Sequence, residues 1–152
     1  MPNTYSQLLV HLIFAVQGRQ NLISNSWKEE LFKYITGIVT NKKQRLLCIN
    51  GTGDHIHILI GLRPDIAVSD LVRDIKSNST NFINTRKFAR GNFNWQTGYG
   101  AFTYSNSQID RVVKYILNQE KHHTKKTFKE EYVEFLNKFS INFEEKYLFD
   151  WL

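Results

Sequence analysis

Apolar residues in the first part of the chain gather in short runs of the kind that form β-strands. Residues 5–16 contain a dense apolar run without a helix-capping pattern. Residues 45–49 and 55–62 form two further runs, joined by a segment that begins with Asn50-Gly51, a strong signal for a β-hairpin turn. The pattern therefore predicts three strands here, the last two of them paired with each other.

Between the first two strand-like runs, apolar residues recur at intervals of three and four positions. Trp27, Leu31 and Ile35 follow this spacing, which is the periodicity of an amphipathic helix. Ser26 and Glu29 are three positions apart at its start, as in a capping box. We therefore expect a helix that begins directly after Ser26.

The second half of the chain shows the same two kinds of pattern. A helical periodicity covers residues 68–87, and Ser107 precedes another helical segment. A strand-like run covers residues 100–105, and a shorter helical pattern covers residues 128–139. Residues 142–152 give no clear prediction.

The resulting order, β-α-β-β-α-β followed by helices, is that of the ferredoxin-like split βαβ fold. It predicts an α+β protein with one four-stranded antiparallel sheet and helices on one face, which leaves the other face open for a site or a partner. The length of 152 residues and the absence of any linker-like segment predict a single domain over residues 1–152. Because this fold carries many functions, function has to be argued from individual residues.

The composition is that of a globular protein with an excess of positive charge. Twenty Lys and Arg against fourteen Asp and Glu give a net charge of +6, which favours polyanions such as nucleic acid. The single cysteine, Cys48, excludes an internal disulfide and is expected to be a small buried hydrophobe. No signal-peptide pattern and no apolar stretch near the roughly 20 residues of a membrane helix are present. We therefore expect a cytoplasmic protein without a membrane partner.

The segment His55-Ile56-His57 is the first candidate for chemistry. Alternate residues of a strand share a face, so Ile56 and Ile58 point toward the predicted helices while His55 and His57 point the other way. Two imidazoles at this spacing can converge on a first-row divalent cation. The alternative is that they are two unrelated histidines on a half-exposed strand.

The helical segment after Ser107 offers further polar groups. Tyr115, Gln119 and His122 are spaced i, i+4, i+7 and so share one face of a helix. An amide oxygen is a ligand that manganese or magnesium accepts. The alternative is an ordinary polar helix face, and the residues alone do not distinguish Tyr115 from the other six tyrosines.

These two motifs, in this order, resemble the single-tyrosine HUH transposases of small bacterial insertion sequences of the 200/605 type. The His-hydrophobic-His motif matches residues 55–57, and the Tyr-x-x-x-Gln motif matches residues 115–119. Further likeness lies in residues 74–79 and 95–102, and in the opening strand with His11. The resemblance covers about residues 5–138.

The resemblance implies a fold of the predicted type, with an additional C-terminal helix that carries the nucleophile. It implies that Tyr115 attacks DNA to form a 5′-phosphotyrosine, and that His55, His57 and Gln119 bind a divalent metal, Mg²⁺ or Mn²⁺. It further implies a homodimer that acts on single-stranded DNA with hairpin ends. The basic residues proposed to contact this DNA are Arg73, Lys76, Arg86 and Lys87.

Three alternatives share parts of this pattern. Another HUH endonuclease role, such as replication initiation, plasmid mobilisation or the service of repeat sequences by a domesticated transposase, would use the same chemistry. A ferredoxin-like nucleic-acid-binding module would use aromatic residues on the open sheet face, where this chain has His55 and His57 instead. A metal-dependent hydrolase would cut DNA without needing Tyr115.

Overall fold

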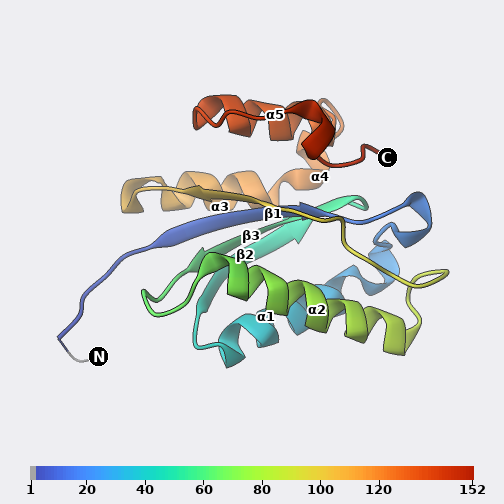
Figure 1. The fold of residues 1–152 in the computed structure, drawn as a ribbon, viewed down its shortest axis with the longest axis horizontal. Helices are drawn as coiled ribbons and strands as arrows, with labels where there is room; N and C mark the ends of the chain where they lie inside the picture. The colour runs from blue at the N-terminus through green and yellow to red at the C-terminus, as the bar shows by residue number, and fades with distance from the viewer. Residues whose placement is uncertain (1–2) are drawn as a thin grey trace.

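Four strands form one antiparallel sheet at the centre of the computed structural model, which describes residues 3–152 (Figure 1). The strand order is β2-β3-β1-β4. In chain order the strands are β1 (Leu9–Ala15), β2 (Arg45–Gly51), β3 (His55–Gly61) and β4 (Gly100–Thr103). The predicted α+β, ferredoxin-like class with a four-stranded antiparallel sheet is confirmed.

Helices lie on both sides of this sheet, with α1 and α2 on one side and α3, α4 and α5 on the other (Figure 1). The α-helices are α1 (Asn25–Asn41), α2 (Val68–Arg86), α3 (Ile109–Leu117), α4 (Gln119–His122) and α5 (Phe128–Lys138). Three short 3₁₀ turns complete the fold: η1 (Arg19–Asn21), η2 (Asn106–Gln108) and η3 (Glu145–Tyr147). None of the helices within residues 3–152 is long and apolar enough to cross a membrane.

The face of β3 toward α1 and α2 carries Ile56, Ile58 and Ile60, as the alternation predicts. All three side chains are fully buried, in one hydrophobic cluster with Leu31 of α1 and Ile75 of α2. Since strand residues alternate, His55 and His57 must then lie on the opposite face. This alternation is what places the histidines toward α3, α4 and α5.

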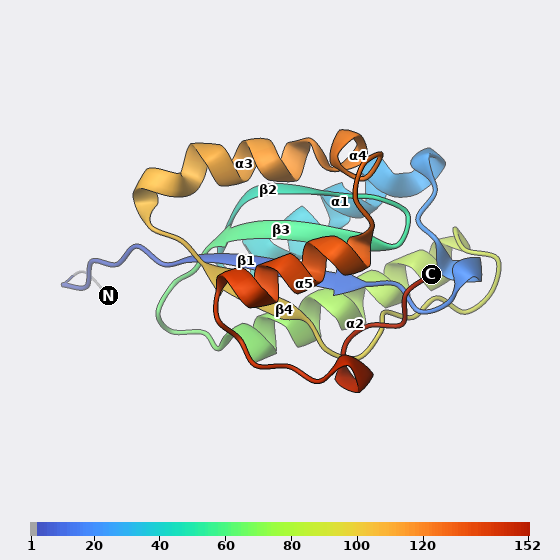
Figure 2. The same ribbon diagram turned by 90° about the horizontal axis from the view of Figure 1, so that it is seen from above.

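The expectation that this opposite face is open was wrong. Helix α3 packs on β2 and β3 through a small cluster that includes Val112, Leu59 and the buried Cys48. Helix α5 crosses β1 and β4 (Figure 2), and its Phe135 ring stacks on Phe102 of β4 with 5.2 Å between ring centroids. The face carries apolar side chains of its own, so a second layer of helices is needed to bury them.

Two helices begin differently from the prediction. The cap of α1 is Ser24 rather than Ser26, because Ser24 has an extended backbone and its hydroxyl accepts the N–H of Ser26 at 3.2 Å. The segment expected to start at Ser107 starts instead with the turn η2. Its capping box joins Ser105 to Gln108, and α3 follows.

Gly51 ends β2 where the hairpin toward His55 begins. A Cβ at this position would lie 2.2 Å from the carbonyl oxygen of His55, so the backbone would have to move. We expect Gly51→Ala to lower the free energy of unfolding by about 1–3 kcal/mol or more, the usual cost of overpacking. Gly37 in α1 has nothing near its Cβ direction, and Gly37→Ala should stabilise by up to about 1 kcal/mol. Urea denaturation of both variants tests this, and equal effects would contradict the steric argument.

Candidate active site

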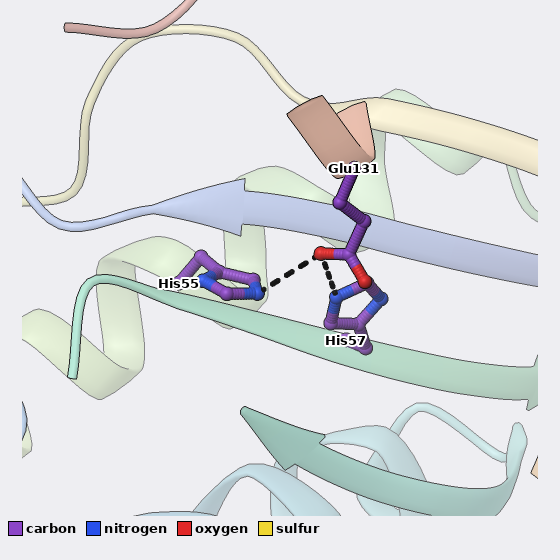
Figure 3. Close-up of side chains that lie close together, drawn as sticks. All are labelled: His55, His57 and Glu131. Atoms are coloured by element: carbon purple, nitrogen blue, oxygen red, sulfur yellow. Dashed lines mark hydrogen bonds and ion pairs between the residues drawn. The ribbon is translucent and has the colours of Figure 1, made fainter. Parts of the chain in front are cut away.

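His55 and His57 lie side by side on β3, and both side chains are completely buried beneath α5 (Figure 3). Each uses its Nδ1 atom in a contact behind the site. His55 Nδ1 donates to Asp54 Oδ1 at 2.7 Å, and His57 Nδ1 is 2.7 Å from His11 Nε2. These contacts orient the rings and direct both Nε2 atoms toward the same space.

His11 connects the site to Tyr104, because its Nδ1 atom lies 3.1 Å from the Tyr104 hydroxyl. The pKa of His11 is well below its ordinary value, mainly because the ring is buried, so His11 is neutral. A neutral ring has one donor and one acceptor nitrogen, so its protonated nitrogen sets which nitrogen of His57 carries hydrogen. His11, noted from the sequence only as part of the family likeness, is therefore a positioning residue for His57.

The sequence predicted that Tyr115 and Gln119 lie on one continuous helix, and this prediction was wrong. Helix α3 ends at Leu117, and Gln119 opens the short helix α4. The Asn50 side chain at the end of β2 donates to the carbonyls of Ile116 and Leu117, both at 3.0 Å, which satisfies the end of α3. Despite the break between α3 and α4, Gln119 reaches the site, where its Oε1 atom accepts a hydrogen bond from His55 Nε2 at 3.0 Å.

Glu131 of α5 joins all these groups and was not anticipated from the sequence. Its side chain is 1% exposed, and its Oε1 atom lies 3.3 Å from His55 Nε2 and 3.1 Å from His57 Nε2 (Figure 3). Its Oε2 atom accepts from Gln119 Nε2 at 3.0 Å and from the hydroxyl of Tyr115. One carboxylate therefore touches the histidine pair, the glutamine and the tyrosine.

The adjacent residues His122 and His123 make different contacts at the site. His123 Nε2 lies 3.0 Å from Glu131 Oε1, so a third imidazole meets the same carboxylate oxygen. His122, predicted to share a face with Tyr115, has its Nε2 atom 3.4 Å from the Tyr115 hydroxyl and 3.7 Å from Glu131 Oε2. His122 is thus at the edge of the site beside the tyrosine.

The donor set fits a divalent cation. His55, His57 and Glu131 each offer one ligand atom, and these atoms lie within 4.8 Å of one another. Ligands bound at about 2.0–2.2 Å in neighbouring positions are separated by roughly 3 Å, close to the spacing of Oε1 from the two Nε2 atoms. Imidazole, carboxylate and amide oxygen together suit a first-row divalent ion such as Mn²⁺.

The charges of the site follow from its burial. Burial alone would raise the pKa of Glu131, but hydrogen bonds from His123, His55 and His57 hold it far below its usual range. Burial and the adjacent Glu131 carboxylate raise the pKa of Tyr115 far above that of a free phenol. At neutral pH the site therefore holds an ionised carboxylate and a protonated phenol.

His55 and His57 respond to this environment in opposite ways. Burial lowers the pKa of His57 to about 4, so this ring is neutral. Burial also disfavours charge on His55, but hydrogen bonds to Asp54 and Glu131 outweigh it and raise the pKa of His55. Both ring nitrogens of His55 face acceptors, Asp54 on one side and Gln119 and Glu131 on the other, which favours its protonated form when no metal is bound.

We expect the metal-free protein to be most stable near pH 6.5, the ordinary pKa of histidine. Between about pH 6.5 and 4 the unfolded chain binds protons at His57 and His11 that the folded protein does not, so stability falls with falling pH. Above pH 6.5 the folded protein keeps a proton on His55 that the unfolded chain has lost, so stability falls as pH rises through the raised pKa. Urea denaturation with a chelator measures this curve. Asp54→Asn should flatten its alkaline side, and a curve flat on the acid side would contradict the lowered pKa of both His57 and His11.

The four basic residues predicted to contact DNA all lie on α2 or directly after it, on the other side of the sheet from His55 (Figure 1). Arg73 pairs with Asp70 and Asp74, and Arg86 pairs with Glu30. Lys76 donates to two backbone carbonyls, at 2.8 and 2.6 Å, and partial burial lowers its pKa to about 8. Lys87 is exposed at the end of the helix. These DNA contacts stay predictions, and Lys76 has a structural role of its own.

Fold and site together define a class: a split βαβ protein in which a His-hydrophobic-His strand faces a helix bearing a tyrosine. Comparison with known proteins agrees with this class. The family model for IS200-like transposases matches residues 4–119. The chain belongs to the IS200-like transposase family, as its motifs indicated.

Individual proteins resemble this chain in sequence or in fold. The ISDra2 transposase TnpA of Deinococcus radiodurans is 25% identical over 119 residues, which are 74% of this chain and 84% of that protein. A crystal structure of a candidate transposase from Deinococcus radiodurans R1 superposes with a TM-score of 0.61 at 23% identity, over 77% of this chain and 94% of that one. A REP-associated tyrosine transposase bound to a REP hairpin has a TM-score of 0.61 at 17% identity, over 80% and 72%. Helix α5 lies beyond the residues that match the family model.

Proposed function

We propose that this transposase cleaves and rejoins single-stranded DNA at the ends of an insertion sequence, with Tyr115 as the nucleophile. One observation carries the proposal. The hydroxyl of Tyr115 meets one oxygen of Glu131, and the Nε2 atoms of His55 and His57 meet the other. The proposed nucleophile and the proposed metal ligands of one chain thus contact the two oxygens of a single carboxylate.

The reaction exchanges one phosphate ester for another. The Tyr115 hydroxyl oxygen bonds to the scissile phosphorus, and the bond from phosphorus to the 3′ oxygen of the preceding nucleotide breaks. The 3′ oxygen leaves with a proton as a free hydroxyl, and the following nucleotide stays attached as a 5′-phosphotyrosine. Because this ester conserves the bond energy, attack by a 3′ hydroxyl can rejoin the strand without ATP.

His55 and His57 would hold a divalent ion, Mg²⁺ or Mn²⁺, with Gln119 and Glu131 as further oxygen ligands. Such an ion neutralises a phosphate oxygen and polarises phosphorus. Gln119 suits this role because its Oε1 atom lies within 3.0 Å of His55 Nε2. The predicted ligand set of two histidines and Gln119 is thereby extended by one carboxylate.

Glu131 also faces the proton that the nucleophile must lose. A phenol with a raised pKa is a weak nucleophile until it loses its proton, and Glu131, whose own pKa lies far below its usual range, is too weak a base to take it; Glu131 Oε2 instead accepts the hydrogen bond of the Tyr115 hydroxyl and holds it in place. The contact lies within one chain and supports the use of Tyr115 in cis. The homodimer and the hairpin ends of the DNA belong to the proposal through the family resemblance alone.

The first experiment looks for the covalent intermediate. The protein is incubated with labelled single-stranded oligonucleotides from the flanks of its own coding sequence, with Mn²⁺, Mg²⁺ or a chelator, and resolved on denaturing gels. A labelled band at the mass of protein plus DNA, formed only with metal, is expected. Metal-dependent cutting without that band would instead indicate a hydrolase, and binding without cutting would contradict the proposed chemistry.

A further inference from the structure

We infer that the cavity between α3 and α5 beside Tyr115 binds the nucleotide on the 3′ side of the scissile phosphate, with Arg111 and Lys138 holding its phosphates. The inference rests on the proposed function for the identity of the strand, and it adds a substrate subsite to it. None of the basic residues predicted from the sequence lies there. The cavity is a feature of tertiary packing.

The cavity has the size and lining of a subsite for one base. Its volume is about 200 Å³, smaller than the roughly 300–1,000 Å³ of sites for whole drug-sized ligands. Tyr115 and Glu131 lie at the catalytic end, and the aromatic rings of Tyr104 and Phe135 line the wall. Aromatic walls suit a DNA base because every base has a face that can stack, whatever its sequence.

Two cations line the same cavity. Arg111 precedes Tyr115 by one helical turn on α3, and Lys138 follows Phe135 by about one turn on α5, so both are near the tyrosine. Within the part of the chain that the structure describes, neither forms an ion pair. Of the two acidic residues that line the cavity, Glu134 is paired with Lys126 at 2.5 Å, and Glu131 is paired with the histidines of the site. The rim therefore offers two uncompensated positive charges to phosphate groups.

The chemistry determines which nucleotide belongs in this cavity. After attack by Tyr115, phosphorus stays bonded through its 5′ oxygen to the nucleotide on the 3′ side, while the preceding nucleotide leaves. The retained nucleotide must therefore lie beside Tyr115, which lines this cavity. Binding it there would hold the covalent intermediate in place until a 3′ hydroxyl arrives.

Photochemical crosslinking tests the site without requiring cleavage. The full-length protein is irradiated, in chelator, with oligodeoxythymidylate that carries one 5-iodouracil, and the crosslinked peptides are mapped by mass spectrometry. We expect crosslinks at Tyr104 or Phe135, and their loss in Arg111→Gln/Lys138→Gln. Crosslinks that map only to α2, or that survive in this variant, would overturn the inference.

A salt titration separates phosphate contacts from a structural effect. By fluorescence anisotropy, the dependence of log affinity on log salt should become shallower by about 0.7 for each lost phosphate contact to a single strand. The matched control is Arg19→Gln/Lys33→Gln, which removes the same two charges from exposed positions away from the cavity. An equal change in both variants would show that only net charge matters and would overturn the site. Neither readout needs the phosphotyrosine. The experiments can therefore contradict the subsite while the proposed reaction holds, or contradict the reaction while the subsite holds.

Discussion

Tyr115→Phe is expected to abolish the covalent protein–DNA band and strand cleavage together. The substitution removes one oxygen and keeps the ring, which contacts the rings of His57, His122 and Phe135. The loss of a covalent nucleophile costs rate on the order of 10⁶-fold in enzymes where it has been measured. Cleavage should therefore fall below detection, while metal binding by His55 and His57 is retained.

The control for this prediction is another tyrosine next to the same site. Tyr104 is half-buried, and its hydroxyl reaches His11 rather than Glu131. Tyr104→Phe should keep the covalent band, with a moderate loss of rate through the positioning of His57. A band that survives in Tyr115→Phe and disappears in Tyr104→Phe would transfer the role of nucleophile to Tyr104. Denaturing gels with the same labelled oligonucleotide report both variants.

The predictable parts of the site are those set by local geometry. The two-residue repeat of β3 required His55 and His57 to share a face, whatever the rest of the chain does. The burial of that face could not be read from the same repeat. It depends on where α5 packs, and helical periodicity predicts a helix without saying which surface it covers.

Tyr115 and Gln119 contact the same carboxylate, but they do not share a helix as their spacing predicted. Four positions on one helix would place the two side chains on a shared face. The helix actually ends at Leu117, where the Asn50 side chain at the end of β2 donates to its carbonyls, and Gln119 begins a new helix. Both side chains still reach Glu131, because tertiary contacts rather than helical spacing bring them together.

Glu131 interrupts an apolar pattern in the sequence. In the helix that starts at Phe128, the apolar stripe is formed by Phe128, Tyr132 and Phe135, and Glu131 falls within it at spacings of three and four. A carboxylate in an apolar stripe is almost never buried unless it is paired. The interruption therefore indicated a buried partner, although only the fold shows that the partners are the histidines of β3.

Glu131→Gln is expected to weaken divalent metal binding by at least about 10- to 100-fold, the loss typical for disturbing the surroundings of a metal site. The amide keeps the shape of the side chain but removes the charge that His55, His57 and His123 share. Breaking a buried ion pair from one side also costs about 3–5 kcal/mol, so the metal-free variant should unfold at lower urea concentration. Calorimetric titration with Mn²⁺ and urea denaturation measure the two effects.

Glu134→Gln supplies the matched control on the same helix. Glu134 lies one turn after Glu131, and its carboxylate pairs on the surface with Lys126, so its loss should change stability by about 0–1 kcal/mol and leave metal binding unaltered. Whether Glu131→Gln weakens or strengthens Mn²⁺ binding distinguishes two roles of Glu131. Weaker Mn²⁺ binding shows that Glu131 completes the ligand set, because its charge then attracts the ion. Tighter binding would mean that the carboxylate occupies the position of the ion and must leave before metal and phosphate can enter, in which case α5 would close the site instead of completing it.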